Sequence, residues 1–253
     1  YTLRITDADG EGGQVPLTSP DPIISPAWSP DGRELAYVSF ETRKAVIWVQ
    51  DMASGTRRQV ANYKGTNSAP AWSPDGRELA VTLSRDGGSQ IFMMGRDGSN
   101  ARRVSQGSAI NTEATFAPDG KTLYFVSDRG GSPQIYKQAV AGGNAERVTF
   151  SGSYNISPDI SPDGRTLAFV QRQGGGAFKV MTMDLASGNT QSVSDTSDDE
   201  SPSFSPNGRF IIYATRAQGR ELLMTTTLDG RIKTRLLTSG LDIREPVWGP
   251  FGR

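Results

Sequence analysis

The sequence predicts an all-β protein: a six-bladed β-propeller with four-stranded antiparallel blades, whose closing blade is shared by the two ends of the chain. Three observations predict this fold. A turn motif recurs at a fixed interval, apolar segments of strand length follow each copy, and no helical periodicity is present. The prolines of the motif are 44 residues apart throughout: Pro30, Pro74, Pro118, Pro162, Pro206 and Pro250.

The first strand of each unit is expected to end at a large apolar residue directly before the turn. These residues are Trp28, Trp72, Phe116, Ile160, Phe204 and Trp248. Because aromatic and aliphatic residues replace one another at this position, we interpret them as core between blades and not as stacking platforms. In the Ser-Pro-Asp-Gly turn that follows, Pro pre-sets φ, Asp bonds to its own backbone and Gly accepts a positive φ. The repeated aspartates are therefore interpreted as structural and not catalytic.

The remaining strands of a unit grade from apolar to charged. The second and third, such as Leu35–Val38 and Val46–Val49, are the most apolar, which is typical of strands sandwiched between neighbouring blades. The fourth is polar, as in Arg57–Val60, and charge on an outer edge strand discourages pairing with other chains. Four strands in about 44 residues is the size of a propeller blade. The whole chain, 1–253, is therefore expected to form one domain around a narrow channel.

The two ends of the chain fit incomplete units. Residues 1–7 match a third strand, 14–17 a fourth strand and 244–248 a first strand, so both ends are expected to build the shared blade. Six full units would need about one more strand and turn than the chain contains. The missing piece would be the second strand of that blade, and we expect the natural protein to continue upstream of Tyr1.

Composition excludes several classes of function. The chain has no Cys and no His, which excludes disulfides, thiolate catalysis, a Ser-His-Asp triad and the usual imidazole metal sites. Lys and Arg total 27, equal to Asp and Glu, so binding of nucleic acid through phosphate neutralisation is not expected. No apolar run approaches the length of a membrane helix. We expect a monomeric, non-enzymatic protein that does not span a membrane.

The candidate site is one mouth of the channel. The segments that enter each first strand differ among the six units, whereas the turns after them barely change, and variable positions on a repeated scaffold are where recognition is expected. Apolar residues there could bury a partner side chain, polar ones could fix its register, and the acidic ones have one local counter-charge. The candidate partner-binding residues are Ile23, Ile24, Thr66, Asn67, Asn111, Thr112, Glu113, Tyr154, Asn155, Asp199, Glu200 and Arg244.

A metal site is the weaker reading of the acidic residues. Asp195, Asp198, Asp199 and Glu200 could ligate a hard cation, but they lack the spacing of a dedicated calcium loop, which favours a solvated acidic turn. No cofactor is expected, although a calcium ion in the central channel stays open. The run Gly174–Gly176 is interpreted as a hairpin tip and not a phosphate loop, because no Lys-Ser/Thr or helix follows it.

The repeat wording resembles the WD40-like (PD40) repeat, and four strings, Val38-Ser39-Phe40-Glu41 among them, resemble the propeller domain of the TolB family. The other three are Pro26-Ala27-Trp28-Ser29-Pro30-Asp31-Gly32, Ser127-Asp128-Arg129-Gly130-Gly131-Ser132-Pro133-Gln134-Ile135-Tyr136-Lys137 and Arg244-Glu245-Pro246. The resemblance implies a periplasmic component of the Tol-Pal cell-envelope system that supports outer-membrane integrity and cell division. It implies two partners at the channel mouth: the lipoprotein Pal and, during colicin import, a colicin TolB-box peptide. The α/β domain that precedes the propeller in the family is absent from this chain.

The chain departs from the family pattern at two places, Thr66 and the ending Trp248-Gly249-Pro250-Phe251-Gly252-Arg253, and two other functions stay open. Thr66 stands where the family commonly has a histidine. An alternative function is a propeller accessory or lyase-type domain acting on peptides or glycans, which would need an attached hydrolase domain or a histidine and a metal. A purely structural or small-ligand-binding propeller is the other alternative.

Overall fold

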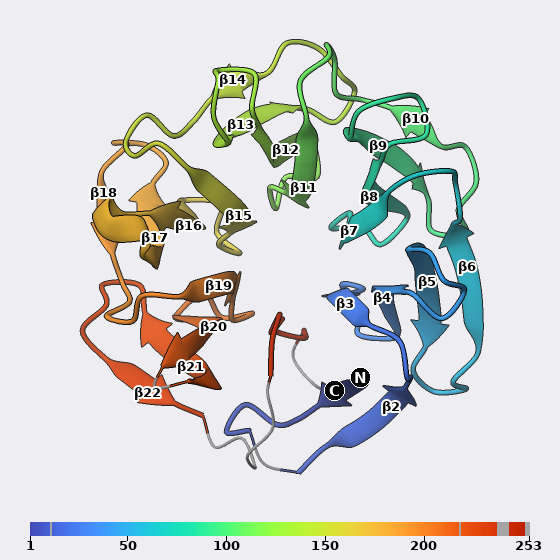
Figure 1. Cartoon of the computed structure of the whole chain (residues 1–253), viewed down its shortest axis with the longest axis horizontal. Coiled ribbons are helices and arrows are strands. Elements are labelled where there is room, and N and C mark those ends of the chain that lie inside the picture. Colours follow the sequence, from blue (N-terminus) through green and yellow to red (C-terminus); the bar gives the residue numbers. More distant parts are fainter. Residues whose placement is uncertain (11, 218, 237–242, 251–253) are drawn as a thin grey trace.

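A computed structural model describes residues 1–10, 12–217, 219–236 and 243–250. In this part of the chain, the strands form five four-stranded antiparallel sheets and one two-stranded sheet. The sheets stand around a central opening, with each sheet running radially (Figure 1). Strands β3, β7, β11, β15 and β19 border the opening, and β6, β10, β14, β18 and β22 form the rim. The prediction of an all-β propeller with four-stranded antiparallel blades is therefore confirmed.

Each full blade pairs its strands in chain order from the channel to the rim. The strands of the first two blades are β3 (Ile23–Trp28), β4 (Glu34–Ser39), β5 (Val46–Asp51), β6 (Arg57–Ala61), β7 (Asn67–Trp72), β8 (Glu78–Leu83), β9 (Gln90–Gly95) and β10 (Arg102–Arg103). The third and fourth contain β11 (Asn111–Phe116), β12 (Thr122–Ser127), β13 (Gln134–Ala139), β14 (Glu146–Arg147), β15 (Asn155–Ile160), β16 (Thr166–Arg172), β17 (Phe178–Asp184) and β18 (Thr190–Ser192). The fifth contains β19 (Asp199–Phe204), β20 (Phe210–Ala217), β21 (Arg220–Thr227) and β22 (Lys233–Arg235). The predicted ends of the first strands at Trp28, Trp72, Phe116, Ile160 and Phe204 are confirmed.

The prediction of six blades is wrong. The described residues form five four-stranded blades, and the sixth position holds only β1 (Thr2–Ile5) paired with β2 (Gln14–Thr18). These two match the predicted third and fourth strands, but the predicted first strand at 244–248 is not a strand. A strand needs a hydrogen-bonded neighbour, and among the described residues none pairs with this segment. Residues 241–242 of the last predicted mouth segment, and Phe251 and Gly252 of the last turn, lie outside the described residues.

The ring is nevertheless closed by packing at the sixth position. The strand β2 stands in the ring between β22 and β6 (Figure 1). In each full blade after the first, the turn glycine faces the turn proline of the preceding blade, as Gly76 does with Pro30. A Cβ on Gly32 would likewise lie 3.0 Å from Cγ of Pro250, so the same contact joins the last segment to the first blade.

The hydrophobic core lies between blades. One cluster combines Val38 and Ile47 of the first blade with Trp72, Leu79 and other residues of the second. The indole N–H of Trp72 also donates a hydrogen bond to the carbonyl oxygen of Ala27 in the preceding blade, at 3.0 Å. Phe116, Ile160 and Phe204 occupy the equivalent place in the next three clusters. The interpretation of this position as interblade core is confirmed.

The turn aspartates are structural, as predicted. In the second blade, the hydroxyl of Ser73 donates to a carboxylate oxygen of Asp75 at 2.6 Å, and the backbone N–H of Arg77 donates to the same oxygen at 3.0 Å. Glu78 N–H closes the turn on Ser73 Oγ at 2.9 Å. The hydrogen bond from Ser73, aided by that of Arg77, holds the pKa of Asp75 below its usual value.

Candidate partner-binding mouth

The face on which the first strands begin is defined here as the mouth face. In antiparallel blades, the connections between second and third strands and those between a fourth strand and the next first strand also lie on this face. Most predicted site residues lie inside the first strands themselves and not in loops: Ile23, Ile24, Asn67, Asn111, Thr112, Glu113, Asn155, Asp199 and Glu200. Thr66 and Tyr154 directly precede β7 and β15.

Every first strand bends at its third residue. The register with the second strand shifts there, as between Ile24 and Ala27, which is the signature of a β-bulge. The bulge residue has a positive φ of 49–53° although none is glycine, and the final segment has the same feature. These left-handed residues are Ser25, Ala69, Glu113, Ser157, Ser201 and Glu245. Backbone held in this region at equivalent points around a channel is a feature that clusters at functional sites.

Two of these left-handed residues are glutamates that join neighbouring positions of the ring. A carboxylate oxygen of Glu113 accepts hydrogen bonds from the backbone N–H and the hydroxyl of Ser157, at 2.7 and 3.2 Å. Glu245 accepts the backbone N–H of Ser25 in the same way. Burial raises the pKa of Glu113; the bonds from Ser157 oppose the rise, and the charge of Glu245 adds to it.

The first residue of four strands is a buried amide or carboxylate. Asn67, Asn111 and Asn155 are fully buried, and Asp199 is nearly so. Their side chains bond within the chain: the amide of Asn67, for example, donates to the carbonyl oxygens of Ala45 and Tyr63 at 3.1 and 2.9 Å. These four residues hold the strand entries, and any contact with a partner stays a prediction for them.

Asp199 is the most heavily bonded of the four. Its carboxylate accepts hydrogen bonds from the hydroxyls of Ser194, Thr196 and Thr215, the last at 2.7 Å, and from the backbone N–H of Val180 at 3.2 Å. The carboxylate is thus committed to the fold. Among the described residues, no group of three or more carboxylates could hold a metal ion. The calcium ion considered from the sequence stays untested.

Only a few of the described residues near the mouth expose their side chains to solvent. Thr66 is exposed, and its backbone N–H donates to Ser84 Oγ at 2.7 Å. Ile110, directly before β11, is 52% exposed, although isoleucine is usually buried. Ile23 and Ile24 are half-buried, and Ile24 packs against the first interblade core.

Two further predicted residues have partners inside the protein. The hydroxyl of Thr112 accepts a hydrogen bond from that of Thr82 at 3.3 Å. Tyr154 meets the ring of Phe178 edge-on, with the centroids 6.1 Å apart. Both side chains remain half-buried and border the mouth.

Several acidic side chains of the fifth blade and of the closing segment lie close enough to Glu200 to act on its charge. Burial raises the pKa of Glu200; Arg244 opposes the rise, whereas Glu245, Glu221 and Asp198 add to it. Arg244 forms an ion pair with Glu221. Glu221 was missed from the sequence, because it lies on β21, a third strand. The antiparallel strand order could have predicted the place of Glu221, because a third strand begins on the same face as a first strand.

Comparison with known proteins identifies relatives of the chain. A family model described as "TolB beta propeller domain" matches residues 1–252. The Tol-Pal system protein TolB of Chromobacterium violaceum is 62% identical over 68 residues, which are 27% of this chain and 16% of that protein. The crystal structure of TolB from Acinetobacter baumannii superposes with a TM-score of 0.93 at 45% identity, covering 99% of this chain and 63% of that one. The chain therefore spans under two thirds of that relative.

A more distant structure shows the fold alone. A putative TolB from Agrobacterium tumefaciens has a TM-score of 0.80 at 22% identity, over 94% of this chain and 88% of that one. In the described part of the chain, no helix has the length and apolarity needed to cross a membrane.

Proposed function

The chain belongs to the TolB β-propeller domain family, and on that premise we propose that it is a non-enzymatic protein-binding propeller of the Tol-Pal system. Its partners would be a Pal-like lipoprotein and colicin-type TolB-box peptides, docked at the channel mouth. Its place would be the periplasm, where such binding supports outer-membrane integrity and cell division. We expect it to act as a monomer without a cofactor.

The observation that carries the proposal is the contrast between scaffold and surface on the mouth face. The first strand residue repeats as a buried asparagine at positions 67, 111 and 155, and its amide bonds within the protein. The residues directly before it differ, and two of them, Thr66 and Ile110, are exposed to solvent. An exposed isoleucine beside a channel is suited to a pocket on a partner protein. A binding role also agrees with the absence of His and Cys from the chain.

Calorimetric titration of the chain with a purified Pal periplasmic domain, with and without calcium, tests this function. We expect saturable binding that weakens by about tenfold or more for Thr66→Arg or Ile110→Asp, because a charge then enters an apolar contact. Ile232→Asp is the matched control, since Ile232 is 63% exposed on the opposite face of the ring. Absence of binding by the unmodified chain would contradict the proposal, and equal loss in all three variants would contradict the mouth as its place.

A further inference from the structure

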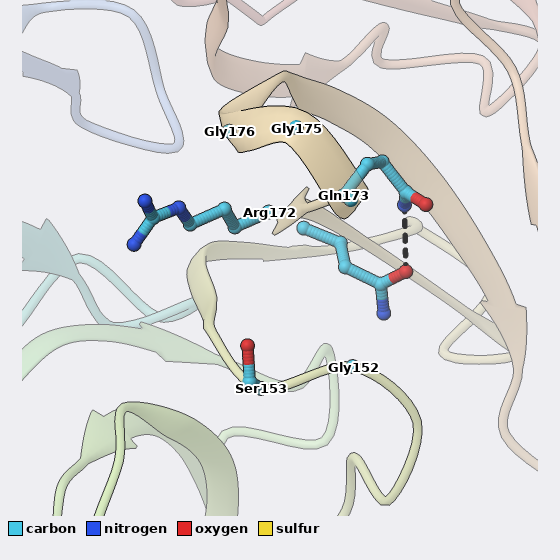
Figure 2. A pocket seen from close by; sticks show the side chains of 8 residues that line it. Gly152, Ser153, Arg172, Gln173, Gly175 and Gly176 are labelled. Atoms are coloured by element: carbon cyan, nitrogen blue, oxygen red, sulfur yellow. Dashed lines mark hydrogen bonds between the residues drawn. The ribbon is translucent and has the colours of Figure 1, made fainter.

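A cavity opens on the mouth face of the fourth blade. Its volume is about 500 Å³, and it lies between the segment before β15 and the hairpin that joins β16 to β17. The lining residues are Gly152, Ser153, Gln171, Arg172, Gln173, Gly174, Gly175 and Gly176. In Figure 2, Ser153 points up toward the glycine hairpin, and Arg172 extends to one side of the opening.

Arg172 gives the cavity its charge. It is the one charged residue of the lining, and its side chain is exposed. Within the described residues, no hydrogen bond, ion pair or ring contact engages its guanidinium. Two other mouth-face arginines are engaged: Arg129 donates to Asn111 Oδ1 at 2.8 Å, and Arg85 lies over the ring of Tyr63 at 4.8 Å. Arg172 therefore keeps its donors available for a ligand.

The walls of the cavity are held in place by the fold. The amide nitrogen of Gln171, a buried residue, donates to Asn155 Oδ1 at 3.0 Å and to the carbonyl oxygen of Ser151 at 3.1 Å. The oxygen of Gln171 accepts a hydrogen bond from Gln173 at 2.7 Å, drawn as the dashed line in Figure 2. A Cβ on Gly152 would lie 2.7 Å from the nitrogen of Gln171, so only glycine permits this close approach.

The glycine hairpin leaves the upper wall without side chains. Gly175 and Gly176 have φ values of 81° and 88°, a conformation that favours glycine. A Cβ on Gly174 or Gly175 would meet nothing within 4 Å, so the space above the backbone is open. A Cβ on Gly176 would lie 4.0 Å from a terminal nitrogen of Arg172, which places the hairpin backbone next to the guanidinium.

The surroundings suit a protein ligand more than a free ion. Phe150, two residues before the cavity lining begins, is 74% exposed, and the guanidinium of Arg147 lies over its ring at 5.3 Å. Exposed aromatic and arginine side chains are enriched where proteins bind one another.

We propose that this cavity is a carboxylate subsite that receives an Asp or Glu side chain of an extended partner peptide. The Arg172 guanidinium would grip the carboxylate through two parallel hydrogen bonds, and the Ser153 hydroxyl and the hairpin backbone would border it. The subsite rests on the proposed function, since it deepens the recognition of a protein partner at the mouth.

The subsite is tested with two capped tripeptides that differ in charge alone, acetyl-Gly-Asp-Gly-amide and acetyl-Gly-Asn-Gly-amide. The full chain is labelled with ¹⁵N, and the amide signals of Gly174, Gly175 and Gly176 are followed during titration. We expect the Asp peptide to bind saturably with a Kd of about a millimolar and the Asn peptide to bind about tenfold more weakly. Arg172→Gln should remove this difference.

Arg216→Gln is the matched control. Arg216 is exposed at the equivalent place on β20, 44 residues further along the chain, and does not line the cavity. This variant should bind the Asp peptide as the unmodified chain does. Equal binding of the two peptides, unchanged binding by Arg172→Gln, or equal loss in Arg216→Gln would each overturn the subsite.

A parallel titration with the Pal periplasmic domain separates the two proposals. If the chain binds Pal but does not distinguish the two tripeptides, the subsite fails and the proposed function stands. If the chain prefers the Asp tripeptide through Arg172 but does not bind Pal, the choice of partner fails and the subsite stands.

Discussion

The carboxylate of Glu245 accepts the backbone N–H of Ser25, 220 residues earlier in the chain, and so repeats at the ring closure the contact that Glu113 makes with Ser157. Both acceptors have a positive φ, and both donors are the positive-φ residues at the next position around the ring. The sixth position has no four-stranded blade, yet it keeps this interblade contact. The contact therefore depends on a glutamate at the positive-φ position and not on strand pairing.

Glu245→Ala is expected to loosen the junction between the two ends of the chain. Removing the carboxylate leaves the Ser25 N–H without its acceptor and should cost about 1–3 kcal/mol of unfolding free energy. Hydrogen exchange measured by NMR should show faster exchange at Ser25, while Ser157 stays protected. Glu245→Gln keeps an acceptor oxygen and serves as the control. Unchanged exchange at Ser25 in the alanine variant would contradict the assigned role.

Trp72 should stabilise the folded protein in two separable ways, through packing and through a hydrogen bond. It is only 7% exposed in the first interblade core, so Trp72→Ala is expected to lower the unfolding free energy by about 3–5 kcal/mol. Trp72→Phe fills much of the space but loses the bond to Ala27, and about 1–2 kcal/mol is expected. Urea titrations followed by circular dichroism measure both values. A phenylalanine variant as unstable as the alanine variant would show that the hydrogen bond outweighs the packing.

The turn aspartates should tolerate asparagine but not alanine. Asn207 stands in the equivalent turn of the fifth blade, where its side-chain oxygen accepts the Ser205 hydroxyl at 2.7 Å. Asp75→Asn should therefore change the unfolding free energy by less than about 0.5 kcal/mol, whereas Asp75→Ala loses two acceptor bonds and should cost about 1 kcal/mol. Thermal and urea unfolding compare the two. Equal costs would mean that the carboxylate charge, and not the acceptor oxygen, holds the turn.

The 44-residue period was sufficient to predict most of the fold. It located the turns and strand ends such as Trp72, because packing between blades needs the same residue type at the same place. The bulges were not predictable, since the residues with positive φ are Ser, Ala and Glu and not glycine. The number of blades was mispredicted because a repeated motif at 244–248 shows that a strand sequence is present, whereas a strand also needs a partner to pair with.

The candidate site was predictable in place but not in detail. Spacing put Asn67, Asn111 and Asn155 at the mouth, but whether a side chain turns toward solvent or into the blade depends on partners distant in the sequence. The recurrence of asparagine at the same interval was the missed signal, since residues that repeat belong to the scaffold. The cavity beside Arg172 could not be predicted from the sequence, because it forms only where two separate segments, 152–153 and 171–176, come together.

Asp159 should make the stability of the protein depend on pH. Its carboxylate lies in β15 and accepts the backbone N–H of Phe204 in the next blade at 2.7 Å and that of Ile160 at 3.0 Å. Burial, which outweighs these two bonds, raises the pKa of Asp159 from 3.8 to about 7. The folded protein then binds this proton more tightly than the unfolded chain does. Its contribution to stability is complete below about pH 4 and is lost as the pH rises through 7.

Asp159→Asn removes the titration while keeping an oxygen that can accept the Phe204 N–H. The unfolding free energy of the unmodified protein should fall relative to that of the variant between about pH 4 and 7, by at most about 1.4 kcal/mol per pH unit, and level off above. Urea unfolding at a series of pH values measures the difference. Glu113 and Glu200, whose pKa values are also raised, titrate in both proteins and cancel in the comparison. If the unfolding free energies of the two proteins instead change in parallel with pH, the pKa of Asp159 is the same in the folded and unfolded protein. That result would contradict the prediction.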